Sequence, residues 1–393
     1  MLRLYIKTIC ILLLLYFRLE GQEKKCGNGI FFSDSLSLVN KMKTDSLLYQ
    51  YLSEPKPTLR SEIIIPTVVH IVWENSLENI SEELIFNQIE ILNKAFNKAN
   101  EDTSDIPLEF KSVIGNLKVK FCLANKTPDG ITSNSIIKIN TTQKEIGLSE
   151  NLYASDKGGS DAWDTDKYLN IWVANTGIII AGFGTYPNQT QPQKTGVVIH
   201  PNYFGLNKHP KFGLGKTLIH EVGHYLGLYH LWGDNSDCEN DDGVADTPPQ
   251  LKAYKGCPIY PQSGCSVSEM FMNFMDYVDD GCMYFFTKGQ VERMVATLNL
   301  FRSGLNNSEI GCNDSANTNQ EILIYPNPSN GLFQIKSKYG LSNDILMFNN
   351  IGQLIHPKIK RELEIIKMDF TNFPSGLYYL KVDETFFKLV KID

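Results

Sequence analysis

The motif His220-Glu-Val-Gly-His224-Tyr-Leu-Gly227-Leu-Tyr-His230 constrains this chain more than any other feature of its sequence. His220 and His224 are four residues apart, so on a helix their imidazoles lie on one face and can bind one metal ion. Glu221 stands beside them and can activate a water in the open position of the metal. Gly227 can end the helix with a positive φ, which brings His230 back as a third ligand. Three histidines with one open position are typical of catalytic zinc.

Chance is a weak alternative for this motif, because the chain has only seven histidines and three of them stand at the required spacing. A relative that binds zinc without catalysis is the stronger alternative, and the presence of Glu221 argues against it.

The residues around the motif predict an α+β domain. Strands are expected at Ile63–Trp73, Val119–Leu123, Leu169–Ala174 and Gly196–His200, and Gly177–Tyr186 is either a strand or a loop. Helices are expected at about Ser81–Asn100, Leu214–Leu228 and Thr287–Leu300, with a long irregular stretch over 233–270. A polar linker at 313–320 then precedes about seventy residues of short strands and turns, which predict a small all-β module.

The amino terminus predicts export. Arg3 and Lys7 precede the apolar run Ile9–Phe17, which is about half the ~20 residues that a membrane helix needs, so residues 1–21 are interpreted as a signal peptide. No later segment is long and apolar enough to span a membrane. Residues 22–60, with helical character around Ser35–Leu52, form a small appendage before the first strand.

Export changes the interpretation of the cysteines. Cys10 leaves with the signal peptide and seven cysteines remain, four of them within residues 238–282, which predicts a disulfide-stapled loop region. Because seven is odd, at least one thiol is free, intermolecular or a metal ligand. The net charge of −7, from 37 basic and 44 acidic residues, argues against a nucleic-acid partner.

The histidine motif matches the long metzincin consensus, and the surrounding chain, over roughly 60–312, resembles the pappalysin family of zinc metallopeptidases. Asn273-Phe-Met-Asp-Tyr277 resembles the Met-turn of that family. The resemblance implies a twisted mixed sheet with an active-site helix, Met275 beneath the zinc, and Tyr277 as a phenol that stabilises the tetrahedral intermediate. It also implies catalysis of peptide-bond hydrolysis with Glu221 as the general base.

The same resemblance covers the segment after the motif. It implies the disulfides Cys238–Cys265 and Cys257–Cys282, and it makes Asp242, Asp246 and Thr247 candidate calcium ligands, with a solvated acidic loop as the alternative.

Cys26, in the expected propeptide 22–60, resembles the latency cysteine of the family, whose thiolate occupies the open position of the zinc in the zymogen. The alternative is a disulfide from Cys26 to Cys122 or Cys312. If Cys26 binds zinc, Cys122 and Cys312 are left over, and their pairing stays open.

The carboxy-terminal module, 321–393, resembles the sorting domain of the type IX secretion system of Bacteroidetes. The matching pieces are Tyr325-Pro-Asn-Pro-Ser-Asn-Gly331, Gly352-Gln353 and Pro374-Ser-Gly-Leu-Tyr378. This implies a small β-sandwich, recognised by that secretion machinery, on a secreted or cell-surface protein. A carbohydrate-binding sandwich is the alternative, and the short strands without an aromatic platform disfavour it.

The sequence therefore predicts an exported zinc endopeptidase zymogen that acts on proteins or peptides, with its catalytic domain over 61–312. A narrowly specific processing protease and a zinc-containing binding or adhesion protein remain as alternatives. Asp279 and Asp280, just after the Met-turn, are candidates for favouring basic side chains in the substrate, unless they are simply solvated.

Overall fold

The chain divides into two compact units, Met1–Cys312 and Asn313–Asp393. The computed structural model describes residues 25–28, 35–55, 62–178, 180–188, 191–233, 237–306, 310–312, 323–336, 345–362, 365–382 and 385–392. The expected signal peptide with Cys10 and the expected linker at 313–320 lie outside the described residues.

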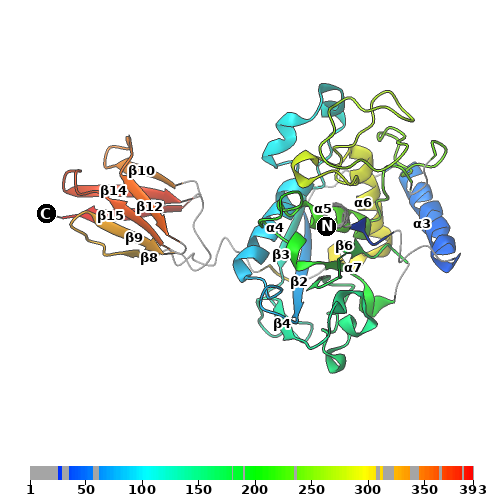
Figure 1. Cartoon of the computed structure of the whole chain (residues 1–393), viewed down its shortest axis with the longest axis horizontal. Coiled ribbons are helices and arrows are strands. Elements are labelled where there is room, and N and C mark those ends of the chain that lie inside the picture. The colour runs from blue at the N-terminus through cyan, green and yellow to red at the C-terminus, as the bar shows by residue number, and fades with distance from the viewer. Residues whose placement is uncertain are drawn as a thin grey trace, which may run out of the picture. The chain divides into compact units, whose positions relative to one another are not determined.

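A seven-stranded mixed sheet organises the first unit (Figure 1). Its strands are β1 (Lys25–Cys26), β2 (Ile63–Trp73), β3 (Val119–Leu123), β4 (Ile136–Asn140), β5 (Leu169–Ala174), β6 (Ile180–Gly184) and β7 (Val197–Ile199). The order is β1-β6-β7-β5-β2-β3, and β4 pairs with β2. Strand β2 pairs in parallel with β3 and β4 through its two halves and with β5 on its other side. At the opposite edge, β6 runs antiparallel to β7 and β1 runs parallel to β6.

The helices of the first unit surround this sheet. They are α3 (Ser35–Ser53), α4 (Glu82–Phe96), α5 (Lys216–Tyr225), α6 (Lys288–Phe301) and α7 (Ser303–Asn306). Short 3-10 helices lie between them: η1 (Glu101–Asp105), η2 (Leu108–Val113), η3 (Ile146–Leu148), η4 (Glu150–Tyr153), η5 (Ser155–Lys157), η6 (Pro192–Lys194), η7 (Pro201–Tyr203) and η8 (Asp280–Cys282). Sheet and helices bury one large apolar core that includes Ile71, Phe96, Ile171, Val222 and Phe274.

Local sequence explains where two of these helices begin. The Ser81 hydroxyl accepts a hydrogen bond from Leu84 N at 3.2 Å and caps α4. Thr287 and Gln290 form a capping box at the start of α6, with reciprocal hydrogen bonds of side chain to main chain. Both caps satisfy main-chain N–H groups that a helix leaves unpaired at its first turn.

Most elements stand where the sequence predicts them, and two differ. Helix α5 is shorter than the expected 214–228, because Gly215 before it has φ +73° and Leu226 is its carboxy-terminal cap. Strand β4 was not expected. Its three isoleucines, Ile136, Ile137 and Ile139, are half-buried, and Lys138 and Asn140 are exposed, so none of its residues is fully buried. The ambiguous segment Gly177–Tyr186 contains strand β6.

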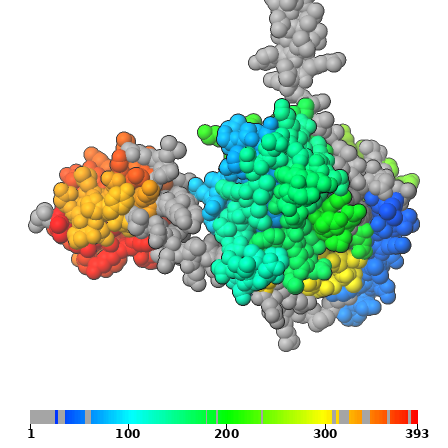
Figure 2. Space-filling view, turned by 90° about the horizontal axis from the view of Figure 1, so that it is seen from below, coloured from blue at the N-terminus to red at the C-terminus, as the bar shows by residue number. Residues whose placement is uncertain are grey.

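Helix α3 packs along α6, as Figures 1 and 2 show, rather than standing apart as an appendage. Leu48 is fully buried at this contact, and Asp45 accepts a hydrogen bond from Arg293 Nη2 at 2.5 Å. The sequence did not reveal this packing because α3 exposes several large apolar side chains and shows no clear apolar stripe.

The second unit is a β-sandwich of two four-stranded antiparallel sheets, with orders β11-β10-β14-β15 and β12-β13-β9-β8. The strands are β8 (Leu323–Tyr325), β9 (Leu332–Lys336), β10 (Ile345–Asn349), β11 (Leu354–Ile355), β12 (Lys358–Glu362), β13 (Ile365–Asp369), β14 (Gly376–Val382) and β15 (Thr385–Lys391). Its core is a separate cluster that includes Phe333, Ile335, Met368, Phe370 and Leu380. The small all-β fold expected for this part of the chain is confirmed.

Among the residues that the structure describes, no helix has the length and apolar character needed to cross a membrane.

Candidate active site

Helix α5 and the turn that follows it place the three motif histidines. His220 and His224 lie on α5, and Gly227 has the left-handed conformation expected from the sequence, with φ +89°. A Cβ at Gly227 would also stand 2.3 Å from Thr297 Oγ1, so both conformation and space require glycine there. The turn returns the chain so that His230 faces the helix.

The three imidazoles converge through their Nε2 atoms. His224 Nε2 lies 3.0 Å from the Nε2 atoms of both His220 and His230. The opposite ring nitrogens are anchored, since His220 Nδ1 lies 2.7 Å from Phe274 O and His224 Nδ1 lies 2.8 Å from Leu228 O. A carbonyl oxygen accepts a hydrogen bond only from an N–H, so the Nδ1 atom of each ring carries the proton. The Nε2 lone pairs of these two rings therefore point at each other. Such a set repels itself without a cation and fits zinc.

The histidines are buried, which further favours their neutral, metal-binding form. Burial, together with the nearby His230 and His220 rings, lowers the pKa of His224 well below its ordinary value. A neutral imidazole is the form that binds zinc.

Cys26 completes this cluster. One ligand atom each from Cys26, His220, His224 and His230 lies within 4.8 Å of the others, and all four residues are buried. Cys26 is the one cysteine without a disulfide in the described part of the chain. Three nitrogens and one sulfur make a complete tetrahedral donor set.

The segment around Cys26 is held against the edge strand β6. Gly27 N donates to Gly182 O at 2.8 Å, and the side chain of Asn28 exchanges two hydrogen bonds with the main chain of Gly184, at 2.7 and 3.0 Å. The chain before the catalytic sheet thus occupies its edge as a parallel strand.

Glu221 lies beside the cluster and is 1% exposed. The Cys26 thiol is 3.4 Å from Glu221 Oε2. Burial raises the pKa of the Glu221 carboxyl to about 8, while hydrogen bonds from Cys26 and Gly184 act in the opposite direction. A carboxylate whose pKa stands near neutrality can both take and return a proton.

The Met-turn lies under the histidines. Met275 is fully buried, and a Cβ on Gly223 would stand 2.5 Å from its sulfur, so the glycine in the helix makes room for the methionine. Tyr277 is half-buried, with its ring centroid 5.7 Å from that of His220 and 4.9 Å from that of His230. The structure thus brings both residues named from the sequence to the histidine cluster.

A pocket opens beside the cluster, with an empty volume of about 410 Å³ that includes space open to solvent. Its lining includes Glu221, Tyr277, Phe212, Asp276 and Asp280. Asp279, the other acidic residue expected to act here, does not belong to the lining.

The segment 238–282 contains the disulfides Cys238–Cys265 and Cys257–Cys282, with Cα–Cα distances of 5.4 and 5.6 Å. A third disulfide joins Cys122 to Cys312, the pair whose connection the sequence left open. Cys26 is therefore not joined to either of them.

The candidate calcium ligands lie in the same segment. Asp246 accepts hydrogen bonds from Thr287 Oγ1 at 2.7 Å and Gly289 N at 2.9 Å, so its carboxylate holds the start of α6. Thr247 Oγ1 lies 2.7 Å from Asp242 Oδ1, and Asp242 Oδ2 is buried without a hydrogen-bond partner among the described residues. Apart from the Cys26 cluster, the described residues hold no group of three or more histidine, cysteine, aspartate or glutamate side chains placed to share an ion.

Several residues at the site were not singled out from the sequence. Trp232 stacks on His230 with a centroid distance of 4.5 Å and an interplanar angle of 4°. The Tyr186 hydroxyl lies 3.2 Å from His224 Nδ1. Trp232 follows His230 by two residues, a weak signal, whereas nothing in the sequence links Tyr186 to the motif.

The fold and this site together define a metallopeptidase of the metzincin type. Residues 153–299 match the family described as pregnancy-associated plasma protein-A, and residues 323–391 match the secretion system C-terminal sorting domain.

Known metalloproteases are similar to this chain in sequence and in structure. An extracellular metalloprotease of Arthroderma gypseum is 30% identical over 254 residues, which cover 62% of this chain and 75% of the relative. One of Arthroderma otae is 29% identical over 258 residues, 64% and 83% of the two chains. Mature mirolysin of Tannerella forsythia, solved with a cleaved peptide, matches with a TM-score of 0.60 and 41% identity over 63% of this chain and 97% of its own. A mutant of promirolysin matches with a TM-score of 0.65 and 36% identity over 72% and 96%.

The chain belongs to the pregnancy-associated plasma protein-A family of metallopeptidases, the pappalysins. It is a secreted zinc endopeptidase made as a zymogen, and it carries a sorting domain for export to the cell surface or beyond.

Proposed function

We propose that His220, His224 and His230 hold the catalytic zinc, that Glu221 is the general base, and that Tyr277 stabilises the developing oxyanion. The observation that carries this assignment is the convergence of buried imidazole Nε2 atoms whose opposite nitrogens are anchored on carbonyls. A zinc ion bound there would polarise the scissile carbonyl and acidify a water.

The protein groups have the following parts in the reaction. Glu221 takes a proton from the attacking water and returns it to the leaving amine, from its buried position beside the cluster. The Tyr277 phenol faces the same space and donates toward the oxygen on which negative charge develops. Met275 supports the histidines from below and takes no chemical part.

Cys26 accounts for latency in this proposal. Its sulfur lies among the three histidines, where it would occupy the zinc position that a water needs. The strand that carries it pairs with β6 and so also covers the edge along which an extended peptide could add. Removal of this segment would free the zinc position and the strand edge together.

The proposed organisation is a signal peptide at 1–21, a propeptide at 22–60, a catalytic domain at 61–312, a linker at 313–320 and a sorting domain at 321–393. The separation of the two compact units after Cys312 supports the third of these boundaries. The type IX secretion machinery is the proposed partner of the sorting domain. Calcium at Asp242, Asp246 and Thr247 stays a prediction, and metal analysis of the purified chain would test it.

We infer that the pocket beside the zinc receives a cationic side chain of the substrate. Asp280 Oδ1 is buried and has no hydrogen-bond partner among the described residues, although Asp280 lines the pocket. Burial raises the pKa of the Asp280 carboxyl to about 6, so it is ionised above neutral pH. An ionised oxygen without a donor favours a lysine or arginine side chain.

Proteolysis by the zinc-loaded full chain after maturation tests this function, with denatured casein and a mixed peptide library as substrates. Glu221→Ala should keep its zinc and lose about 10²–10⁴-fold in turnover, because general-base catalysis contributes roughly that much. Glu109→Ala, which removes a surface carboxylate, should cleave like the wild type.

Near-normal turnover by Glu221→Ala would contradict the assignment. Cleavage of a few library peptides but not casein would favour a narrowly specific processing enzyme. No cleavage at all by a zinc-loaded wild type would favour a binding protein.

A further inference from the structure

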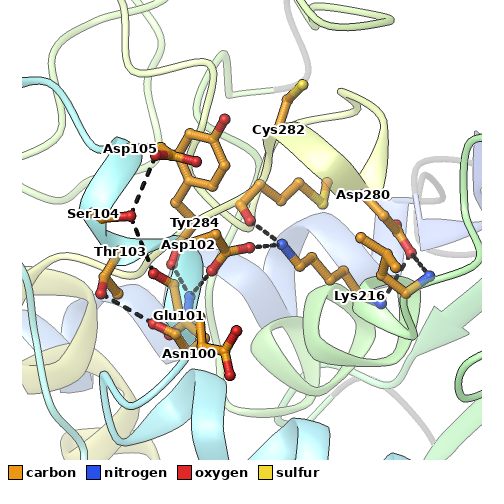
Figure 3. A network of polar contacts seen from close by, with 12 residues as sticks. Asn100, Glu101, Asp102, Thr103, Ser104, Asp105, Lys216, Asp280, Cys282 and Tyr284 are labelled. Atoms are coloured by element: carbon orange, nitrogen blue, oxygen red, sulfur yellow. Dashed lines mark hydrogen bonds and ion pairs between the residues drawn. The ribbon is translucent and has the colours of Figure 1, made fainter. Parts of the chain in front are cut away.

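Lys216, the first residue of helix α5, has a buried ammonium group that lies next to the substrate pocket. Its side chain is 8% exposed, and its Nζ donates to Asp102 and to Met283 O, the latter at 2.6 Å. Figure 3 shows the Lys216 ammonium beside the Asp102 carboxylate. Because Met283 lines the pocket, Lys216 is attached directly to the pocket wall.

Asp102 comes from η1, far from α5 in the sequence, and is held in place by its neighbours (Figure 3). Asn100 Nδ2 donates to Asp102 Oδ1 and also to Tyr284 O, the latter at 2.8 Å. One carboxylate oxygen is thus bound by Asn100 and the other by Lys216. These hydrogen bonds hold the Asp102 carboxylate against the Lys216 ammonium.

Lys216 is also bound to Asp280, but only through its main chain. Leu214 N and Lys216 N donate to Asp280 Oδ2 at 2.8 and 3.3 Å. Burial raises the pKa of Asp280, while these two main-chain hydrogen bonds and the positive charge of Lys216 act in the opposite direction. Asp280, which belongs to the pocket lining, therefore has one bonded oxygen and one oxygen without a partner among the described residues. The main chain of the buried Lys216 binds the first of these oxygens.

This arrangement raises a problem of competition. Without another partner, the ammonium of Lys216, whose main chain already binds Asp280, is expected to pair with the second oxygen of that carboxylate. Such a pair would neutralise a residue of the pocket lining. In the structure the ammonium binds Asp102 instead.

We propose that Asp102 keeps the Lys216 ammonium away from Asp280, so that Asp280 Oδ1 stays available for a cationic side chain of the substrate. Asp102 is then a positioning residue for specificity. This inference rests on the proposed peptidase function and on the cationic preference of the pocket. A purely structural role for the Asp102–Lys216 pair would instead affect all substrates alike.

The test compares two peptides that differ only in the residue that occupies the pocket, with lysine in one and methionine in the other. Asp102→Asn should raise KM for the lysine peptide about tenfold or more, because the released ammonium competes for Asp280, and should leave the methionine peptide within about twofold. Assays at about pH 8 keep Asp280 ionised.

Three further variants make the test specific. Asp105→Asn removes the same charge from the same loop without contacting Lys216 in the structure, and should behave like the wild type. Asp102→Glu should restore much of the lysine preference. Asp102→Asn combined with Lys216→Met removes the competing cation as well, and should recover the preference that Asp102→Asn loses.

The outcomes separate this inference from the proposed function. A wild type that cleaves neither peptide contradicts the peptidase function, and one that cleaves both equally well contradicts the cationic preference. If the wild type prefers lysine but Asp102→Asn keeps the same ratio, or slows both peptides equally, the positioning role of Asp102 is wrong. Folding of each variant is checked by its thermal unfolding midpoint.

Discussion

The two units of this protein differ in how many charged side chains they bury. The first buries the ionisable side chains of Glu221, Asp276, Asp280, Lys216 and Arg293. Among the described residues of the second unit, the buried polar or charged side chains are those of Ser329 and Lys391, and the core is apolar.

Buried charges cost folding free energy unless partners compensate them, so a fold retains them mainly where they are needed. In the first unit, Glu221, Asp276 and Asp280 line the pocket beside the histidine cluster. A sorting domain needs none of this, because recognition by an export machinery takes place at its surface. The comparison predicts that chemistry and latency depend on the first unit alone.

The largest expected effect concerns latency. The unprocessed full chain with Cys26→Ala should cleave substrate about a hundred times faster than the wild-type zymogen. Four zinc ligands together contribute about 10–16 kcal/mol of binding free energy, so the loss of one ligand weakens the latent state by roughly 3 kcal/mol. Initial cleavage rates, measured before any maturation occurs, check this.

Ser329→Ala, a buried substitution in the second unit, should leave latency unchanged. The assignment of Cys26 is contradicted if Cys26→Ala stays as inactive as the wild-type zymogen while binding one zinc.

The next prediction uses a matched pair of core leucines, Leu380 in the second unit and Leu298 in the first, both with 0% exposure. Leu380→Ala should destabilise the second unit by about 2–5 kcal/mol, because truncation of a buried leucine leaves a cavity. Leu298→Ala should do the same to the first unit. Calorimetry of the full chain, combined with proteolysis assays, distinguishes the two transitions.

Leu380→Ala should leave kcat/KM unchanged at temperatures below its unfolding transition. A marked loss of proteolysis there would show that the two units depend on each other and would break the comparison.

The last prediction is a pH dependence that belongs to the first unit. His70 is fully buried, with Nδ1 2.8 Å from Ser160 Oγ and Nε2 3.0 Å from Asn170 Oδ1, and burial lowers its pKa from 6.5 to about 4. Between these pH values His70 is protonated in the unfolded chain and neutral in the folded chain. The stability contribution of His70 is thus complete above pH 6.5 and is lost as the pH falls toward 4, by up to about 3 kcal/mol.

Denaturant unfolding of the first unit between pH 7 and about pH 4 measures this slope. His70→Gln should flatten it, and the stability of the second unit should not follow it. Equal slopes for wild type and His70→Gln would exclude His70 as the cause.

Much of the fold was predictable because its signals are local. Strands β2, β3 and β5 consist mostly of apolar residues, and they occupy the residues expected from the sequence. Strand β4 was missed although three of its five residues are isoleucines, which favour strands. The docking of α3 on α6 was not predictable, because it depends on partners distant in the sequence.

The sequence by itself determined the histidine motif, the left-handed glycine that follows the helix and the family, because each depends on residue type at short spacing. Only the tertiary structure decided how distant residues combine. It placed Cys26 among the histidines, joined Cys122 to Cys312, and set Asp102 against Lys216 beside the pocket. These contacts span many tens of residues, and the packing of the core, rather than any local pattern, brings them together.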